Sequence, residues 1–386
     1  MTGWAILGTG AVAAKFALDL GQAGGRVVAV GSRNPDRARA FLANLPARLK
    51  TPDARIGSAA EAVQAPGVQA VYIATPPSLH EAQAQLAFAA GRAVLIEKPI
   101  APDAPTARRI AEAAALAGVF CMEALWTRFL PMTRQISGLL DRQALGEVRA
   151  FQADFMGSDR PDPGLSLFDP ALGGGALLHR GIYPLSLALL FLGPVQALAA
   201  TGRLGATGVE EEAVIVLTHR SGAISTLRSS LRGGGANGMT LSGTEASLVV
   251  EGPVFRPFRA QLLRHGQRQG GMTGGIAGGT GGGYRMRGWR ESGPAQALNR
   301  LLTAGPLAEL LAGRPGGGLL RAPPLGNGYG HQAVEVARAL AAAERQSPLF
   351  PLADSIEALR LTDQARDLIR NAVQPGPAAP ESGETA

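Results

Sequence analysis

The chain has 386 residues, a formal net charge of +7 and a sequence pI near 10.2. This length exceeds one typical core, so two globular domains are expected. The arginines are scattered and aromatic residues make up only 5% of the chain, which disfavours nucleic-acid binding and favours an anionic small ligand. The single cysteine, Cys121, excludes an internal disulfide. Without a signal segment or a membrane-length apolar run, the sequence predicts a cytoplasmic protein with no membrane contact.

The N-terminal stretch is typical of a dinucleotide-binding unit. An apolar strand at residues 4–7 runs into a G-x-G-x-x-A turn, a helix follows over residues 15–20, and a second strand spans residues 26–30. Glycines in such a turn let backbone N–H groups approach a pyrophosphate at the start of a helix. The turn residues that we expect to contact the cofactor are Gly8, Thr9, Gly10, Ala11 and Val12.

The end of the second strand indicates which dinucleotide is bound. NAD sites place an acidic residue there to bind the ribose hydroxyls. This chain instead has Ser32 and Arg33, followed by Arg37 in the next helix. A hydroxyl and a guanidinium suit a 2′-phosphate, so NADP is predicted over NAD. The alternative is that Arg33 is an ordinary solvated arginine in an arginine-rich chain.

A third strand, residues 68–74, ends in a turn with two prolines that stop the ladder. Ser78 is a good N-cap for the helix that follows, and His80 lies in the first turn of that helix. At this sheet edge we expect His80 to face the cofactor, and the alternative is a solvated histidine. The turn residues expected at the cofactor are Ala74, Thr75, Pro76 and Pro77.

The strand at residues 93–96 ends directly in Glu97, Lys98 and a proline. Ligands bind outside the carboxyl ends of the strands of an open parallel sheet, so Lys98 is placed where a substrate lies. The chain has only three lysines among its 37 basic residues. A desolvated amine changes its protonation state, whereas a guanidinium does not. These features favour a functional lysine over the alternative of a surface Lys-Glu turn.

The spacing of strands and helices predicts an α/β protein with two domains. Strand, helix and strand alternate through residues 1–122, which predicts a Rossmann domain with a doubly wound parallel sheet. Strands follow one another with few helices in residues 123–372, which predicts an α+β domain with an open, mainly antiparallel sheet. The glycine-rich residues 270–283 are expected to form a flexible loop, and residues 373–386 a disordered tail.

Two patterns in the second domain bear on function. The helical stretch at residues 173–192 holds His179 and Tyr183 four residues apart, which places them on one helical face. Pro184 is expected to kink or break that helix. Residues 213–217 are apolar at consecutive positions, which indicates a strand buried on both faces. We therefore expect a second subunit to cover this sheet, giving a homodimer.

Several runs together resemble the glucose–fructose oxidoreductase and inositol dehydrogenase family (Gfo/Idh/MocA). Within it, the run Met122–Pro131 is similar to the branch of dimeric dihydrodiol dehydrogenases and NADP-dependent D-xylose dehydrogenases. The resemblance implies a Rossmann domain, a second domain with an open sheet, a dimer, and hydride transfer at a carbon that bears a hydroxyl. The family runs are Gly8–Gly10, Ala74–Pro77 with His80, Glu97–Pro99 and Gly173–Leu178.

The resemblance also implies roles for individual residues. In that branch, the lysine of the Glu-Lys-Pro motif and the tyrosine of the Gly-Ile-Tyr motif sit at the reacting hydroxyl, and they correspond to Lys98 and Tyr183. We expect Tyr183 to be the acid/base, because a nearby ammonium lowers the pKa of a phenol. Glu97, Trp126 and Arg128 are expected in the cofactor site.

One position departs from that branch. His179 stands where an aspartate is usual, and the next residue, Arg180, is unusually polar. Three interpretations stay open: His179 takes over the role of the carboxylate and could be the base itself, the usual activity is lost, or His179 merely fills the space. The sequence thus predicts an NADP-dependent dehydrogenase or reductase acting on CH–OH groups of a sugar or cyclic diol. The alternatives are a non-catalytic NADP-binding sensor or partner protein, and an enzyme for a non-carbohydrate substrate such as an imine or enone.

Overall fold

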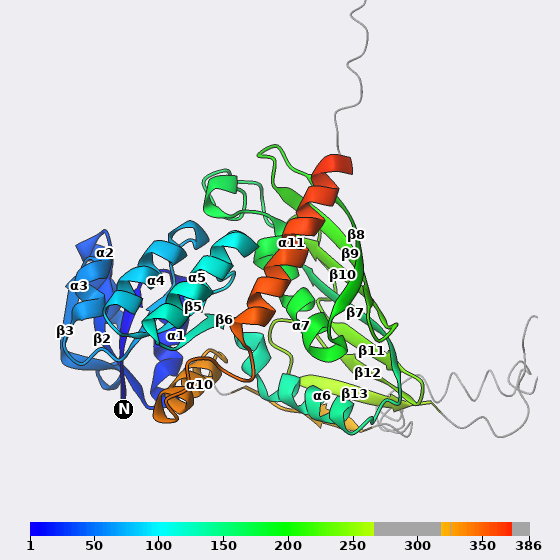
Figure 1. The fold of residues 1–386 in the computed structure, drawn as a ribbon, viewed down its shortest axis with the longest axis horizontal. Coiled ribbons are helices and arrows are strands. Elements are labelled where there is room, and N and C mark those ends of the chain that lie inside the picture. Colours follow the sequence, from blue (N-terminus) through cyan, green and yellow to red (C-terminus); the bar gives the residue numbers. More distant parts are fainter. Residues whose placement is uncertain (266–317, 325, 373–386) are drawn as a thin grey trace, which may run out of the picture.

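The computed structural model describes residues 1–265, 318–324 and 326–372, and it contains two sheets with helices packed between and around them (Figure 1). The predicted glycine-rich loop at residues 270–283 and the predicted tail at residues 373–386 lie outside the described residues. The first sheet lies on the left of Figure 1 and the second on the right, and helix α11 (Leu352–Ala372) runs between them.

The first sheet is parallel throughout, with strand order β3-β2-β1-β4-β5-β6. The predicted doubly wound sheet is therefore confirmed. Its strands are β1 (Thr2–Leu7), β2 (Gly25–Gly31), β3 (Lys50–Gly57), β4 (Ala70–Ile73), β5 (Ala93–Glu97) and β6 (Cys121–Ala124). Its connecting helices are α1 (Ala11–Leu20), α2 (Pro35–Asn44), α3 (Ala59–Gln64), α4 (His80–Ala89) and α5 (Ala104–Ala117).

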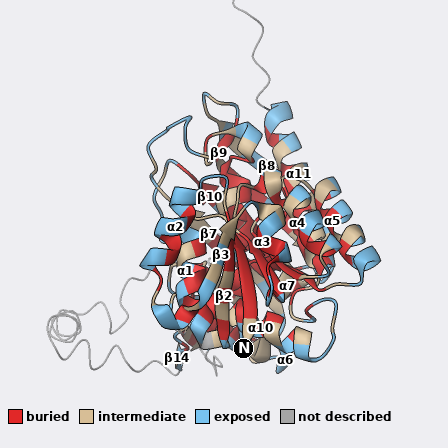
Figure 2. Ribbon diagram, turned by 90° about the vertical axis from the view of Figure 1, so that its left-hand side faces the viewer, coloured by how far each residue is buried: buried red, intermediate tan, exposed pale blue. Residues whose placement is uncertain are grey.

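The strands of this sheet differ in how deeply they are buried. Every residue of β4 and β5 is buried, so these strands are continuous apolar runs, as expected where helices cover both faces (Figure 2). The edge strand β3 is only half-buried and carries polar residues on consecutive positions. It was missed in the sequence because it has neither an apolar run nor a clear alternation.

The second sheet is mixed but mostly antiparallel, with order β14-β13-β12-β11-β7-β10-β9-β8. The predicted antiparallel sheet is confirmed except that β10 pairs with β7 in parallel. Its strands are β7 (Val148–Met156), β8 (Val195–Leu204), β9 (Glu210–His219), β10 (Ile224–Ser230), β11 (Met239–Gly243), β12 (Ala246–Val250), β13 (Arg259–Arg264) and β14 (Leu319–Arg321). The remaining helices outside α11 are α6 (Pro131–Asp141), α7 (Ile182–Leu192) and α10 (Gly330–Ala341).

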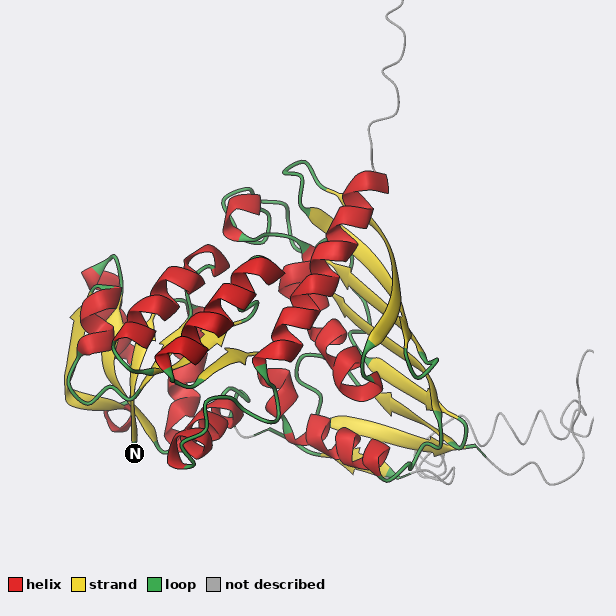
Figure 3. Cartoon of the chain, in the orientation of Figure 1, coloured by secondary structure: helices red, strands yellow, loops and turns green. Residues whose placement is uncertain are grey.

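Helices cover one face of the second sheet and, within the described chain, leave the other open (Figure 3). Along β9, Ala213, Ile215 and Leu217 are buried, whereas Val216 between them is 38% exposed. Burial therefore alternates in a single chain, which differs from the burial on both faces predicted from the consecutive apolar residues. The difference arises because α7 and α11 pack only on the inner face.

The segment from Pro170 to Leu192 is long and apolar enough to cross a membrane by length and composition alone, contrary to the sequence expectation. However, 72% of its most apolar window is buried inside the protein, as in the core helix of a globular domain. This segment is also not one helix, because a π-helical turn at Leu177–Gly181 precedes α7.

The chain returns to the first domain after the second sheet. The carboxylate of Asp19 on α1 is buried and accepts hydrogen bonds from the backbone N of Asn327 (3.0 Å) and of Tyr329 (2.9 Å). Helix α10 follows and packs beside α1. Two segments far apart in sequence thus meet beside the C-terminal end of α1, and Tyr329 lies at the junction of the domains, where it stacks on Trp126 after β6.

Candidate active site

The turn after β1 has the geometry of a dinucleotide cradle. Gly8 has φ +108°, and a Cβ there would lie 2.5 Å from the carbonyl oxygen of Ala74, so only glycine fits. Gly10 is the N-cap of α1 and has no side-chain cap, and a Cβ there would meet nothing within 4 Å. The first N–H groups of α1 therefore face open space beside a close-packed turn, which fits a pyrophosphate.

The end of β2 is cationic and exposed. The hydroxyl of Ser32 accepts a hydrogen bond from the backbone N of Asn34 (3.1 Å), and the Asn34 side chain caps α2. Arg33 and Arg37 are both exposed at this corner. A groove of about 520 Å³ between α1 and α2 is lined by Arg37 together with Thr9 and other residues of the glycine turn. These residues fit a phosphorylated ribose next to the pyrophosphate position.

His80 lies inside the protein, whereas the sequence suggested that it faces the cofactor. It is fully buried, with Nε2 2.8 Å from the carbonyl oxygen of Thr75 and Nδ1 3.2 Å from that of Ile100. Burial lowers its pKa. The ring thus ties together the turns that follow β4 and β5, and its contacts are structural. Ser78 is exposed and caps nothing, because a 3₁₀ turn at Pro77–Leu79 precedes α4.

Two buried carboxylates support the strand end that carries Lys98. Glu97 accepts a short hydrogen bond from the hydroxyl of Tyr72 and another from the backbone N of Lys98 (3.2 Å). Burial raises the pKa of Glu97 to about 7. Glu123 on β6 accepts from the backbone N of Ile100 (3.0 Å), and burial raises its pKa as well. Both carboxylates thus accept from backbone N–H groups of the turn at Lys98–Ile100 and fix its conformation.

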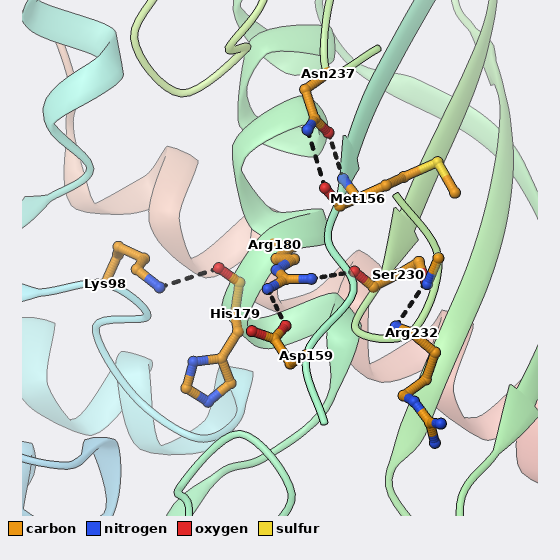
Figure 4. Close-up of polar contacts among 9 residues, drawn as sticks. Lys98, Met156, Asp159, His179, Arg180, Ser230, Arg232 and Asn237 are labelled. Carbon is orange, nitrogen blue, oxygen red and sulfur yellow. Dashed lines mark hydrogen bonds and ion pairs between the residues drawn. The ribbon is translucent and has the colours of Figure 1, made fainter. Parts of the chain in front are cut away.

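Lys98 reaches from β5 to the second domain. Its Nζ donates to the carbonyl oxygen of His179 (3.1 Å; Figure 4). The same Nζ lies 5.4 Å from the centre of the Tyr183 ring. Burial lowers the pKa of Lys98 although the negative charges of Glu97 and Glu123 oppose the shift, and the charge of Arg180 lowers it further. The predicted meeting of Lys98, His179 and Tyr183 is therefore present in the structure, and the amine is poised to lose its proton more readily than a solvated lysine.

Tyr183 is buried, and its hydroxyl oxygen accepts a hydrogen bond from Nε1 of Trp126 (3.2 Å). Its pKa is raised well above the usual value, first by burial and then by the negative charge of Glu97. This direction corrects the expectation that Lys98 lowers the pKa of this phenol. The ammonium lies over the face of the ring instead of beside the hydroxyl, so burial dominates.

His179 sits in the π-helical turn at Leu177–Gly181, just before α7. The π turn interrupts the continuous helical face expected for His179 and Tyr183. Burial, reinforced by the charges of Lys98 and Arg180, lowers the pKa of His179 to about 3, so the ring is neutral at physiological pH and a weak base. Its Nε2 is buried without a hydrogen-bond partner among the described residues.

Trp126 and Arg128 follow β6 but point to different places. Trp126 stacks on Tyr329, with ring centres 4.5 Å apart, and so lies beside Tyr183 at the junction. Arg128 is buried and donates to the carbonyl oxygen of Ser186 (2.9 Å) and to Asp354 (2.5 Å) at the start of α11. Its contacts hold α11 and α7 together.

Sequence reasoning missed Tyr72 and Tyr329, which both border the Lys98 turn. Tyr72 is the one polar-tipped residue in a fully buried strand, which indicates that its hydroxyl needs a buried partner. Tyr329 gives no comparable signal, because its position depends on Asp19, 310 residues earlier in the chain.

A dinucleotide cradle beside a lysine and a tyrosine from two domains defines a nicotinamide-dependent oxidoreductase. The family model described as "Oxidoreductase family, NAD-binding Rossmann fold" matches residues 2–125, and the GFO/IDH/MocA C-terminal domain model matches residues 133–249. The chain therefore belongs to the Gfo/Idh/MocA oxidoreductase family, and the predicted family is confirmed.

Relatives and solved structures agree with this assignment. The trans-1,2-dihydrobenzene-1,2-diol dehydrogenase of Sus scrofa is 32% identical over 259 residues, which cover 66% of this chain and 75% of that protein. The human enzyme of the same name is 30% identical with the same coverage. An aldose-aldose oxidoreductase from Caulobacter crescentus, complexed with glycerol, has a TM-score of 0.74 at 21% identity, covering 96% of this chain and 98% of that one. A 3-ketoreductase from Actinomadura kijaniata, in complex with NADP, has a TM-score of 0.72 at 24% identity, with coverages of 95% and 98%. These structures share the fold.

Proposed function

We propose that this protein is an NADP-dependent oxidoreductase that transfers a hydride between nicotinamide and a hydroxyl-bearing carbon of a sugar or cyclic diol. One observation carries the proposal: Nζ of Lys98 lies 3.1 Å from the carbonyl oxygen of His179 and over the Tyr183 ring, at the same sheet edge as the glycine turn. The substrate class is supported by the diol and aldose named for its relatives.

The cofactor supplies the hydride acceptor for oxidation and the hydride donor for reduction. The glycine turn at Gly8–Val12 would hold its pyrophosphate, and the turn at Ala74–Pro77 borders the same site, since Ala74 packs on Gly8. Ser32, Arg33 and Arg37 would hold the 2′-phosphate, because a guanidinium binds phosphate through two parallel hydrogen bonds.

The proton is handled by Lys98 and Tyr183 in different ways. The lowered pKa of Lys98 makes the neutral amine available to accept the proton of the substrate hydroxyl as the hydride leaves. Tyr183 stays protonated, and its oxygen already accepts from Trp126, so its own O–H is directed to the substrate oxygen. This assignment exchanges the roles expected from the sequence, where Tyr183 was the acid/base. Nε2 of His179 is buried without a hydrogen-bond partner among the described residues, so it would bond a second substrate hydroxyl.

The test is NADPH formation by the purified protein on a panel of aldoses, inositols and cyclic diols, with NAD compared with NADP. Turnover with NADP preferred supports the proposal. A second candidate, a non-catalytic NADP-binding protein, is favoured by the two groups that are already hydrogen-bonded within the protein, Lys98 to a carbonyl and Tyr183 to Trp126. Tight NADP binding without turnover on the whole panel would identify that candidate.

We also propose a homodimer through the outer face of the second sheet. Val216, Ile224 and Val249 are 38%, 49% and 37% exposed on these strands, near a groove of about 560 Å³ lined by Gln152 and Thr226. Apolar side chains gathered on an open sheet face are typical of a subunit interface. Light scattering at micromolar concentration should give twice the monomer mass of 39.7 kDa, and a Val216→Arg substitution should return it to the monomer value. A wild-type monomer would exclude this interface.

A further inference from the structure

A second cation stands beside Lys98. Arg180 follows His179 in the π-helical turn, and its side chain is only 12% exposed. Figure 4 places its guanidinium across the His179 turn from Lys98, which approaches from the first domain. Because Arg180 lowers the pKa of both Lys98 and His179, its positive charge reaches the reacting region.

The aromatic rings beneath the two cations are neighbours. Lys98 lies over the Tyr183 ring, and Arg180 lies 5.6 Å from the centre of the Phe155 ring. The rings of Phe155 and Tyr183 meet edge to face, with centres 5.4 Å apart. Lys98 and Arg180 therefore lie over two rings that touch each other within one aromatic cluster.

The contacts of Arg180 leave part of its bonding capacity open. Its guanidinium donates to the carbonyl oxygen of Ser230 and forms an ion pair with Asp159 (Figure 4). These contacts use two of the five N–H donors that an arginine carries. Asp159, in the loop after β7, is 34% exposed and is the residue that pairs with Arg180. Asp159 pairs with one nitrogen of the guanidinium, so the remaining N–H donors stay available to a second acceptor.

The negative groups nearest Lys98 are already bonded within the protein. Glu97 accepts from Tyr72 and from the backbone N of Lys98, and Glu123 accepts from the backbone N of Ile100. His179 is uncharged at neutral pH because its pKa is about 3. An incoming ligand thus meets two cations, Lys98 and Arg180, and one partly exposed carboxylate, that of Asp159.

We propose that Arg180 is a specificity-determining residue and that the substrate is a polyhydroxy carboxylate, such as a uronic or aldonic acid, whose carboxylate binds Arg180. This inference rests on the proposed oxidoreductase function and narrows its substrate class. A planar guanidinium matches a carboxylate in two-point geometry, and a partly buried site strengthens the bond. Lys98 remains free for the proton at the neighbouring hydroxyl-bearing carbon.

The test compares matched pairs that differ in the carboxylate, D-glucuronate with D-glucose and D-gluconate with D-glucitol. For the wild type, kcat/KM should be at least tenfold higher for the acids. Arg180→Met should lower kcat/KM for the acids by about 10- to 100-fold, the range for a hydrogen bond to a charged group, and change the neutral compounds less than threefold. Arg180→Lys should recover part of the loss. Arg232→Met is the matched control, because Arg232 lies nearby but pairs with Glu211.

Equilibrium binding separates failure of this inference from failure of the proposed function. Quenching of tryptophan fluorescence in the NADP-saturated protein measures binding of glucuronate and glucose without turnover. Arg180-dependent binding of glucuronate with no turnover on any compound would uphold the carboxylate site and refute the enzyme. Turnover on neutral sugars without preference for the acids, or a preference for glucose 6-phosphate over glucuronate, would overturn the carboxylate assignment. Melting temperature and NADP affinity of Arg180→Met report its folding, and if it fails to fold, the Arg180→Lys variant decides by its ratio of acid to neutral activity.

Discussion

Two turns carry the candidate site, and they are specified in different ways. The turn after β1 is fixed by backbone: Gly8 occupies a left-handed conformation against Ala74, and Gly10 leaves space in front of α1. The π-helical turn before α7 is fixed by side chains, with His179 buried and Arg180 bonded to the loop after β7. The shape of the first turn therefore follows from its glycines, whereas the chemistry of the second turn depends on burial and on neighbouring charges.

This difference separates cofactor binding from proton chemistry. Substitutions on the second turn and its partner Lys98 should change turnover and leave NADP affinity intact, and substitutions at the end of β2 should do the reverse. A variant that changes both would break the comparison.

Replacing Lys98 should have the largest effect. Lys98→Met keeps the length of the side chain but removes the amine, so kcat should fall by about a thousandfold or more, within the range for loss of an acid/base group. In the wild type, the oxidation rate should rise with pH as Lys98 loses its proton, with a midpoint below the ordinary lysine pKa, and this rise should be absent in the variant. Lys15→Met, at an exposed position of α1, is the control. Unchanged turnover in Lys98→Met would remove Lys98 from the mechanism.

Tyr183→Phe should have the next largest effect. It removes the hydroxyl that donates to the substrate oxygen and leaves Nε1 of Trp126 without its acceptor. We expect kcat to fall by at least a hundredfold while the pH dependence due to Lys98 persists. Single-turnover measurement of hydride transfer checks this. Loss of the pH dependence in this variant, with Lys98 intact, would return the acid/base role to Tyr183.

His179 gives a prediction on stability. Its pKa is about 3 in the folded protein and near 6.5 when unfolded, so its contribution to stability is complete above about pH 6.5 and is lost as the pH falls towards 3. His179→Gln lacks this loss. Between pH 7 and pH 4, the free energy of unfolding should fall by up to ~3 kcal/mol less in the variant than in the wild type.

Denaturant unfolding at the two pH values measures this difference. His265→Gln, at the surface, controls for removal of an imidazole. Identical pH dependence in wild type and His179→Gln would mean that His179 protonates freely in the folded state, and that the second turn is more open than its burial indicates.

The contrast between the turns also explains how far the sequence could be read. The parallel sheet, the glycine turn and the placement of Lys98 follow from local patterns, because apolar runs and glycines encode them directly. The sequence could not predict that the pKa of Tyr183 is raised, because a pKa depends on desolvation, and the sequence does not show that the ammonium lies over the ring. The inward orientation of His80 and the contribution of Tyr329 depend on contacts with Ile100 and Asp19, which only the fold brings together.

Replacing Arg33 should have the smallest effect, and it tests cofactor binding separately from proton chemistry. Arg33 is exposed at the end of β2 and makes no hydrogen bond or ion pair with any described residue, so its removal should leave the fold unchanged. Arg33→Ala should weaken NADP binding by about 1.5 to 3 kcal/mol, the range for a hydrogen bond to a charged group, and leave NAD affinity nearly the same. Titration calorimetry with both cofactors measures the two affinities. Arg39→Ala is the matched control, because Arg39 is an exposed arginine on α2 that pairs with Asp36. Equal losses for NADP and NAD would mean that Arg33 does not distinguish the 2′-phosphate, and the cofactor preference would then have to come from Arg37 in the groove beside the glycine turn.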